Sequence, residues 1–347
     1  MQKNSISQNK PAIIKKSFGF LANGKEVFCY TLSTKSGMEL DVINYGASLV
    51  SLKIPLENGN KVDVVLGFES LSDYINSFGL PNAPYFGAIV GRYAGRINQA
   101  QFPLNDKVIS LTKNYNLHQI HGGLEGFSKA FWEVITADSN SITLEYCSKN
   151  GEENFPGEVV TQITYSLTED GELKVSMIAK SNQDTILNLT QHSYFNLDGH
   201  SDSIVNQELL VNASETLETT SENIPIGKFI NLKEHEFDFS TPKKCPTYID
   251  NTFVLSKENA IAATLFSKKN NLKMSVLTNQ PAVHIYVGGN CFNQIKGKEN
   301  ANYHPLSGIC FEAQNFPDAP NHEHFPSAVL KKGETYIHNT IFKFENL

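Results

Sequence analysis

The feature of the sequence that most constrains the fold is an alternation of apolar and polar residues with a period of two. Two neighbouring segments, Val159–Leu167 and Leu173–Ala179, show this alternation clearly, and Asp170-Gly171 lies between them. Successive side chains of a β-strand point to opposite faces, so the alternation is typical of strands with one buried face. An Asp-Gly pair between two such runs favours a tight turn. The two segments therefore predict a β-hairpin.

Similar alternation recurs over most of the chain. It predicts strands at Glu39–Ile43, Val62–Phe68, Ser141–Tyr146, Glu208–Asn212, Leu272–Leu277, Val283–Val287, Gly308–Ala313 and Thr335–Phe344. Only Ser70–Phe78 has a helical pattern, with Ser70 placed three residues before Asp73 as in a helix cap. So many half-buried strands need two packed sheets. We therefore expect an all-β protein with a large antiparallel β-sandwich.

Length and composition favour one globular domain. The chain has 347 residues, of which 40% are hydrophobic and 19% charged, enough to bury a large core. No Pro/Ser-rich linker, internal repeat or low-complexity tract divides it. We expect a single domain over residues 13–345, preceded by a polar tail over residues 1–12. The concave face of a large sheet is a suitable place for a small ligand.

The charge pattern indicates which partners to expect. A net charge of -7 and an isoelectric point near 5.8 disfavour nucleic acid and anionic membranes as partners. The N-terminal residues lack the apolar core of a signal peptide, and no apolar run is long enough to span a bilayer. We therefore expect a protein that binds a small neutral molecule and is either cytoplasmic or has lost its leader. We also expect a monomer or a homodimer.

The five cysteines are odd in number, scattered and never arranged as a Cys-x-x-Cys pair: Cys29, Cys147, Cys245, Cys291 and Cys310. This pattern favours free thiols over a disulfide framework or a thiolate zinc site. His118 and His121 are three residues apart on a predicted loop with no nearby third ligand. We therefore expect no metal site.

The segment Asn188–Leu197 combines apolar residues with an unusual number of polar ones. Its sequence is Asn-Leu-Thr-Gln-His-Ser-Tyr-Phe-Asn-Leu, which we interpret as a buried strand. Burying a hydroxyl or an amide without a partner costs ~1–3 kcal/mol, so these groups indicate a polar pocket. His192 is the titratable member. It is either a hydrogen-bonded structural histidine or a group that transfers protons.

Arginine is confined to one short segment. Among 29 basic residues only Arg92 and Arg96 are arginines, and both lie in Gly91-Arg-Tyr-Ala-Gly-Arg-Ile97. The planar guanidinium group donates two parallel hydrogen bonds, which lysine cannot do. Each arginine therefore either grips a carboxylate or sugar hydroxyls, or forms a structural salt bridge.

Two carboxylates stand in unusual surroundings. Asp250 precedes an apolar segment and either caps a turn or accepts a hydrogen bond from a ligand hydroxyl. Glu312 lies inside the otherwise apolar Ile309–Gln314 segment. A carboxylate in such a strand requires a partner or a chemical function.

These residues resemble the galactose mutarotase, or aldose 1-epimerase, family over nearly the whole chain. The matching motifs, in the order of the family, are Asn44-Tyr-Gly-Ala-Ser-Leu, Val65-Leu-Gly-Phe, Gly91-Arg-Tyr-Ala-Gly-Arg-Ile, His121-Gly-Gly, Phe155-Pro-Gly, the Asn188–Leu197 segment, Asp250-Asn-Thr-Phe-Val-Leu and Phe311-Glu-Ala-Gln-Asn-Phe-Pro-Asp-Ala-Pro-Asn. The segments around His192 and Glu312 are the most specific. The resemblance implies a β-supersandwich that interconverts the α and β anomers of a free aldohexose, such as galactose or glucose, without a cofactor.

By similarity, Glu312 is the general base that takes the proton of the anomeric hydroxyl. His192 is then the general acid that protonates the ring oxygen, and His121 assists. Arg92 and Asp250 are expected to bind the sugar. Arg96 is expected to act on stability. One acid and one base with separated pKa values suffice for ring opening, in agreement with the residues themselves.

The sequence departs from the family pattern at three positions, which leaves the sugar specificity open. Gly95 stands where the family often has Asn, Asn251 where a His commonly follows the aspartate, and His284 where Gln is frequent. We expect His284 to contact a sugar hydroxyl.

Three alternative functions remain open from the sequence. A hexose-6-phosphate 1-epimerase and a non-catalytic sugar-binding protein of the same fold are two of them. The third is a glycoside hydrolase, which would use Asp250 with Glu312.

Overall fold

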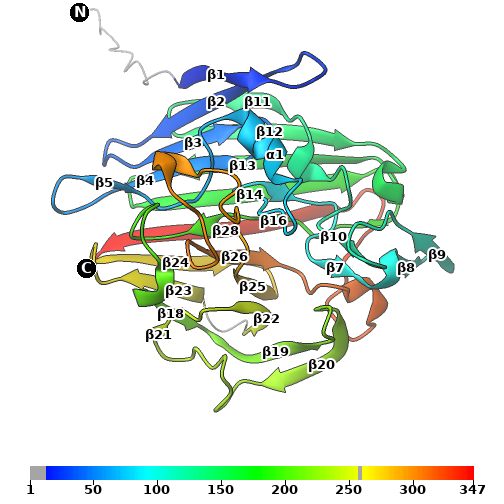
Figure 1. The fold of residues 1–347 in the computed structure, drawn as a ribbon. Helices are drawn as coiled ribbons and strands as arrows, with labels where there is room; N and C mark the ends of the chain where they lie inside the picture. Colours follow the sequence, from blue (N-terminus) through cyan, green and yellow to red (C-terminus); the bar gives the residue numbers. More distant parts are fainter. Residues whose placement is uncertain (1–12, 257–259) are drawn as a thin grey trace, which may run out of the picture.

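The computed structural model of this protein describes residues 13–256 and 260–347, so the expected N-terminal tail over residues 1–12 lies outside the described part. Its largest sheet has nine antiparallel strands and crosses the molecule, with the long strand β28 near its centre (Figure 1). In spatial order the strands are β11 (Glu133–Ala137), β12 (Ser141–Ser148), β13 (Val159–Leu167), β14 (Glu172–Ser181), β28 (Thr335–Asn346), β24 (Leu272–Thr278), β23 (Ile261–Ser267), β18 (Glu208–Val211) and β21 (Lys243–Lys244).

Two further sheets complete the main architecture. A five-stranded sheet consists of β1 (Ile14–Phe20), β2 (Glu26–Ser33), β3 (Glu39–Ile43), β4 (Leu49–Pro55) and β5 (Lys61–Asp63). A six-stranded sheet has the order β17 (Tyr194–Phe195), β26 (Ile309–Gln314), β25 (Ala282–Val287), β22 (Ile249–Leu255), β19 (Ala213–Thr219) and β20 (Pro225–Asn231).

A shared hydrophobic core holds these sheets together. The core includes Leu40 of the five-stranded sheet, Phe311 of the six-stranded sheet and Phe342 of the nine-stranded sheet. The rings of Phe195 and Phe342 lie 4.9 Å apart between their centroids and join two of the sheets directly. Packing of the apolar strand faces against one another confirms the predicted antiparallel β-sandwich.

The remaining elements are short. The strands are β6 (Ile89–Val90), β7 (Arg96–Ile97), β8 (Gln101–Leu104), β9 (Lys107–Ser110), β10 (Gln119–Ile120), β15 (Thr185–Ile186), β16 (Thr190–Gln191) and β27 (Val329–Leu330). Short 3-10 helices cover Asn98–Ala100, Phe127–Lys129, Glu152–Asn154, Ile204–Asn206, Lys298–Asn300 and Ala319–Asn321. No helix in the described residues is long and apolar enough to cross a membrane.

The predicted hairpin and helix are both confirmed. Strands β13 and β14 pair in register from Val159 opposite Ser181 to Leu167 opposite Leu173. Helix α1 covers Leu71–Ser77, and the Ser70 hydroxyl accepts a hydrogen bond from the backbone N–H of Asp73, as a helix cap should.

The predicted strand Val62–Phe68 is too long. Strand β5 ends at Asp63, whose carboxylate accepts a hydrogen bond from the backbone N–H of Leu52. Beyond it the chain crosses to the six-stranded sheet, where Leu66 donates its backbone N–H to the carbonyl of Tyr194. A side chain thus takes the place of a backbone partner at the strand end.

The segment Asn188–Leu197 is buried as expected, but it is not one continuous strand. Strand β16 pairs with β6, whereas β17 pairs with β26, so the chain changes its partner at His192 and Ser193. The Gln191 side chain bridges this break, because its amide contacts both the hydroxyl and the backbone N–H of Ser193. Local polar side chains therefore replace the sheet hydrogen bonds here.

A buried ion pair fixes the connection between β25 and β26. Lys298 in this connection donates from Nζ to Asp63 Oδ2 over 2.7 Å, and both side chains are over nine-tenths buried. Burial opposes ionisation of Asp63, but the charge of Lys298, its hydrogen bond and the contact with His200 together outweigh burial and hold the pKa of that carboxyl below its usual range. The hydroxyl of Tyr303, from the same connection, contacts His200 Nδ1 at 2.9 Å.

The loop after β10 lies tightly against the backbone of Gly91. Gly122 has φ +83, and a Cβ at this residue would lie 1.9 Å from the Gly91 carbonyl oxygen. Gly151 has a similar φ of +86 but open space around its Cβ position. A comparison of the two glycines therefore distinguishes the effect of backbone strain, which both share, from that of a steric clash, which only Gly122 has.

We expect Gly122→Ala to lower the free energy of unfolding more than Gly151→Ala does. Left-handed backbone costs an L-residue ~1–2 kcal/mol at either site. Displacing a backbone carbonyl adds about 2 kcal/mol or more at Gly122 alone. Urea denaturation followed by fluorescence measures the difference. Equal losses in the two variants would contradict the close contact.

Candidate active site

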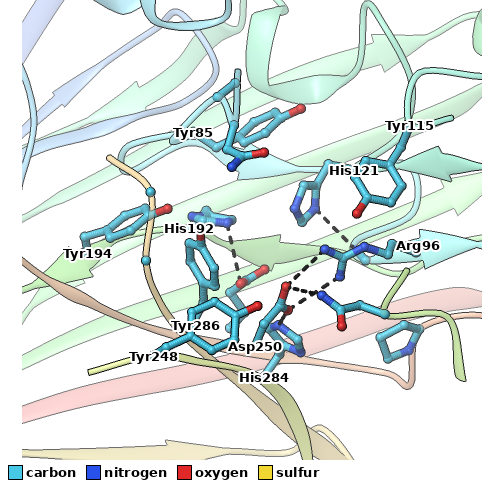
Figure 2. Close-up of a pocket in the computed structure, with 18 of the residues that line it drawn as sticks. Tyr85, Arg96, Tyr115, His121, His192, Tyr194, Tyr248, Asp250, His284 and Tyr286 are labelled. Carbon is cyan, nitrogen blue, oxygen red and sulfur yellow. Dashed lines mark hydrogen bonds and ion pairs between the residues drawn. The ribbon is translucent and has the colours of Figure 1, made fainter. Parts of the chain in front are cut away.

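A pocket of about 370 Å³ opens over one face of the six-stranded sheet (Figure 2). Its floor is formed by residues that alternate along the strands: Asp250 of β22, His284 and Tyr286 of β25, and Glu312 and Gln314 of β26. Pairing of His284 directly opposite Glu312 brings these side chains to one side of the sheet. The walls come from connecting segments and include Tyr85, Arg96, Tyr115, His121, Asn223, Tyr248 and Phe292.

His192 and Glu312 form a buried pair in this pocket. Nε2 of His192 lies 3.5 Å from Oε1 of Glu312, and both side chains are nearly inaccessible to solvent. The second carboxylate oxygen, Oε2 of Glu312, is buried without a hydrogen-bond partner in the described structure. An unpaired buried acceptor is costly, so this oxygen is prepared for a hydroxyl of a ligand.

His121 stands beside this pair. Its ring is nearly perpendicular to that of His192, with 5.4 Å between the centroids. Nδ1 of His121 accepts the backbone N–H of Gly95 over 3.3 Å. Burial, together with the positive charge that His192 can carry, lowers the pKa of His121 well below its usual value. His121 is therefore neutral near pH 7, with Nε2 as its hydrogen-bond donor.

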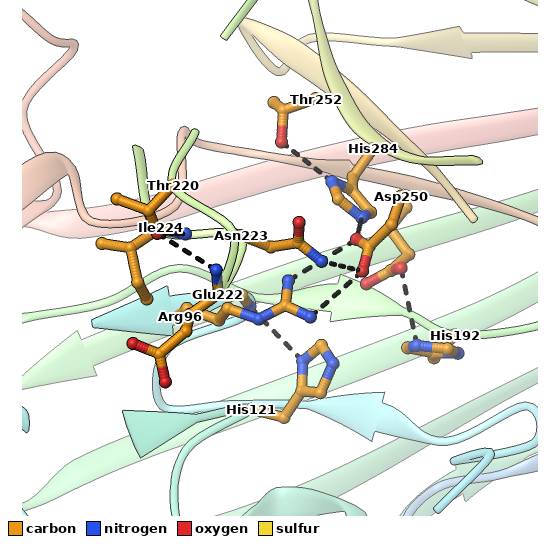
Figure 3. A network of polar contacts seen from close by, with 12 residues as sticks. Arg96, His121, His192, Thr220, Glu222, Asn223, Ile224, Asp250, Thr252 and His284 are labelled. Atoms are coloured by element: carbon orange, nitrogen blue, oxygen red, sulfur yellow. Dashed lines mark hydrogen bonds and ion pairs between the residues drawn. The ribbon is translucent and has the colours of Figure 1, made fainter. Parts of the chain in front are cut away.

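Asp250 is the centre of a second polar group, shown in Figure 3. Its carboxylate accepts hydrogen bonds from His284 Nε2 at 2.8 Å, Asn223 Nδ2 at 2.7 Å and Arg96 Nη2 at 3.1 Å. Burial opposes ionisation of Asp250, but these donors and the charge of Arg96 hold its pKa below the usual range. Asp250 is therefore a fixed carboxylate.

His284 lines the pocket, yet both of its ring nitrogens have protein partners. Nε2 faces Asp250, and Nδ1 lies 2.8 Å from the hydroxyl of Thr252. Neutral imidazole satisfies both contacts, with Nε2 donating and Nδ1 accepting. The expected contact with a sugar hydroxyl stays a prediction, and the structure adds a role in holding Asp250.

The two arginines have the reverse of the expected placement. Arg92 is almost fully buried and does not line the pocket; it donates to the Ser148 hydroxyl and to the carbonyl oxygens of Ser148, Lys149 and Pro156. All of its guanidinium nitrogens are thus used to bind a loop. Arg96 lines the pocket, and its guanidinium carbon lies 5.1 Å from the Tyr115 ring centroid. We expected Arg92 at the ligand site, but the structure places Arg96 in the pocket wall and Arg92 away from the pocket.

Of the three positions that depart from the family pattern, Gly95 and His284 line the pocket and Asn251 does not. Asn251 precedes Thr252 and follows Asp250 on β22, so it points to the opposite sheet face. Sequence reasoning missed Tyr286 and Gln314, although each lies two residues beyond an identified site residue on the same strand. Asn223 comes from a connecting segment that carries no local signal.

One group of side chains in the pocket deserves a test as a metal site. His121, His192 and Glu312 each offer a ligand atom, and these atoms lie within 4.8 Å of one another. Sequence spacing could not reveal this group, because its members come from three segments. The Gly95 N–H occupies Nδ1 of His121, which leaves the hydrogen on Nε2 and makes that nitrogen a donor instead of a metal ligand. We therefore assign no metal to the group, and its residues remain available for acid–base chemistry.

Comparison with known proteins agrees with this geometry. The sequence model described as "Aldose 1-epimerase" matches residues 29–343. The galactose mutarotase of Bos taurus is 37% identical over 318 residues, covering 88% of this chain and 91% of the relative. The aldose 1-epimerase of Haemophilus influenzae is 33% identical, covering 91% of this chain and 95% of the relative.

Solved structures give the same result. The GalM/aldose epimerase homologue of C. elegans superposes with a TM-score of 0.86 at 26% identity, covering 92% of this chain and 99% of the other. The galactose 1-epimerase of Lactobacillus acidophilus gives a TM-score of 0.83 at 26% identity, covering 96% and 98%. The chain therefore belongs to the aldose 1-epimerase family, and its activity is the isomerase activity of that family, the interconversion of sugar anomers.

Proposed function

We propose that this enzyme interconverts the α and β anomers of free aldohexoses, such as galactose and glucose, with Glu312 as general base and His192 as general acid. The observation that carries this proposal is the buried pair of His192 and Glu312, whose facing atoms are 3.5 Å apart, while Oε2 of Glu312 has no hydrogen-bond partner among the described residues. Glu312 can accept a proton and His192 can supply one, and the two groups are closer together than the width of a sugar ring.

In the first half of the reaction, Oε2 of Glu312 takes the proton of the anomeric hydroxyl. The C1 carbonyl forms as the bond between C1 and the ring oxygen breaks, and that oxygen takes a proton from Nε2 of His192. Rotation about C1–C2 then presents the other carbonyl face. Ring closure returns the first proton from Glu312 and the second to His192, so the enzyme ends in its starting state.

The other polar residues bind and orient the sugar in this proposal. Arg96 is the cation of the pocket wall, and its Nε is buried without a partner in the described structure. Asp250 is already surrounded by donors, so we assign it the role of holding Arg96 and Asn223 toward the ligand. His121 donates from Nε2 to the ring oxygen or to a neighbouring hydroxyl.

The lining of the pocket favours an unphosphorylated sugar. Among its described residues Arg96 is the only lysine or arginine, and its guanidinium is paired with Asp250. A phosphate carries about two negative charges and is usually bound by several cationic or backbone donors. The pocket therefore offers little to a hexose 6-phosphate.

Polarimetry with freshly dissolved α-galactose, α-glucose and glucose 6-phosphate tests the proposed function. We expect the enzyme to accelerate the change of optical rotation of the free sugars, with a kcat/KM at least about 10-fold above that for the phosphate. A higher kcat/KM for glucose 6-phosphate than for the free sugars would contradict the proposal and indicate a hexose-6-phosphate 1-epimerase. No acceleration with any of them would leave sugar binding without catalysis.

The glycoside hydrolase alternative is disfavoured by the state of Asp250. That mechanism requires one carboxylic acid that is protonated when the reaction begins. Contacts with His284, Arg96 and Asn223 hold Asp250 ionised instead. Asp250 could therefore act only as the ionised carboxylate of such a pair, yet its oxygens are already engaged by these donors, and His192 beside Glu312 would have no role.

The acid–base pair gives a prediction for pH and mutation. We expect a bell-shaped pH dependence of kcat, because the proposed step needs a base in its ionised form and an acid in its protonated form at the same time. The titration of His121 or Asp250 does not account for the fall of kcat at higher pH, because both pKa values are held low. Glu312→Gln and His192→Asn should each lower kcat ~10²–10⁴-fold with small changes in KM.

The double variant should lose far less than the product of the two single effects, because both groups serve one ring-opening step. The measurement is kcat of the wild type and the three variants by polarimetry, corrected for spontaneous mutarotation. Turnover near the wild-type rate in Glu312→Gln would end the mechanism.

The exchanged positions of the two arginines give a further prediction. Arg96→Lys should raise KM about 10-fold or more, because lysine cannot keep both the Asp250 contact and a directed donor to the sugar. Arg92→Lys should instead lower the free energy of unfolding by ~2–4 kcal/mol, since buried carbonyl groups lose their donors. Each variant serves as the control for the other in kinetics and urea denaturation. The opposite phenotypes would return the sugar contact to Arg92.

A further inference from the structure

One strand supplies a neighbour to each ring nitrogen of His192. Glu312 and Cys310 lie two residues apart on β26, so their side chains point to the same sheet face. The sulfur of Cys310 lies 3.7 Å from Nδ1 of His192, and Oε1 of Glu312 lies 3.5 Å from Nε2. The imidazole therefore sits between a thiol and a carboxylate from the same strand.

Cys310 is suited to a hydrogen-bonding role and to little else. It is 0% exposed, and it pairs across the sheet with Tyr194 on one side and Tyr286 on the other. Burial, and secondly the negative charge of Glu312, raise the pKa of the Cys310 thiol well above its usual value. The sulfur therefore stays a neutral thiol, which is a weak hydrogen-bond donor and a weak acceptor but neither a nucleophile nor a thiolate ligand.

The other groups around His192 do not replace this contact. Tyr85, His121 and Tyr194 face its ring, with 5.8, 5.4 and 5.4 Å between ring centroids, and Glu312 faces Nε2. Within the described structure, the contact recorded at Nδ1 is the one with Cys310. A catalytic imidazole that works through one nitrogen needs the other nitrogen to be held, because this contact sets the ring orientation and the tautomer.

We propose that Cys310 is a positioning residue for the isomerase reaction, which holds Nδ1 of His192 so that Nε2 delivers its proton into the pocket beside Glu312. The imidazolium donates its Nδ1 hydrogen to the sulfur and gives up only the Nε2 hydrogen to the ring oxygen. In the neutral ring the hydrogen stays bonded to Nδ1 and is donated to the sulfur of Cys310. The free lone pair is therefore at Nε2, where the proton must return. Because sulfur accepts weakly, it orients the imidazolium with little stabilisation of its charge.

Three variants test this role. Cys310→Ala removes the Nδ1 partner, Cys310→Ser leaves a shorter polar partner, and Cys245→Ala is the matched control. Cys245 is also a buried free cysteine, but no histidine contact is recorded for it among the described residues. Kinetic constants come from polarimetry across pH, and thermal unfolding measures the loss of packing in each variant.

We expect Cys310→Ala to lower kcat about 10-fold with KM within about twofold, since misorientation costs less than the ~10²–10⁴-fold loss of the acid itself. Cys310→Ser should retain more of kcat than Cys310→Ala. Cys245→Ala should lose similar thermal stability with unchanged kcat. Wild-type kcat in Cys310→Ala, or equal kcat losses in the alanine and serine variants, would overturn the proposal.

A spectroscopic measurement provides a readout that does not depend on turnover. The ring nitrogens of His192 are assigned by ¹⁵N NMR as the signals absent from His192→Asn. We expect the Nδ1 signal to be that of a protonated nitrogen, and Cys310→Ala to shift it while Cys245→Ala leaves it in place. An unprotonated Nδ1 in wild type, or no shift in Cys310→Ala, would overturn the inference.

This inference rests on the proposed role of His192 as the acid, and the two can fail separately. An active His192→Asn variant removes the acid assignment whatever happens at Cys310. An inactive His192→Asn variant together with normal kinetics and NMR signals in Cys310→Ala removes only the role of Cys310.

Discussion

The register between β25 and β26 is the constraint on which the pocket depends. His284 lies directly opposite Glu312, and Tyr286 lies opposite Cys310, so alternate residues of both strands reach the same face. A shift of one residue would turn Glu312 into the hydrophobic core. The apolar residues between them, such as Phe311 and Ile285, belong to that core and therefore fix the register. Core packing and the position of the Glu312 carboxylate are thus set by the same pairing.

The two carboxylates on this face, Asp250 and Glu312, differ in how fully their oxygens are hydrogen-bonded. Asp250 is surrounded by an arginine, a histidine and an amide, which keep it charged and hold it still. Glu312 faces one imidazole, and within residues 13–256 and 260–347 its Oε2 has no hydrogen-bond partner. A fully satisfied carboxylate is a structural element, whereas a partly satisfied one retains the capacity to take up a proton. This difference supports the separate roles that we propose for Asp250 in orienting the sugar and for Glu312 in proton transfer.

Sequence reasoning predicted the fold class well because alternation with a period of two is a direct consequence of strand geometry. The hairpin around Asp170-Gly171 and the identities of His192 and Glu312 as pocket residues followed from local patterns. Arg92 and Arg96 could not be distinguished in this way. They are four residues apart in an irregular segment, and only the tertiary fold decides which of them meets Asp250 and which meets the Ser148 loop. The break at His192 was hidden for the same reason, since a change of partner strand leaves no periodic signal.

The ion pair between Lys298 and Asp63 has a consequence for how the sugar enters and leaves. The connection that carries Lys298 also supplies Gly288, Phe292 and Pro305 to the pocket wall. Breaking a buried pair by removing one partner typically costs ~3–5 kcal/mol, so the contact fastens this wall to the five-stranded sheet. A ligand that enters or leaves on this side therefore passes a wall that is tied to the body of the protein.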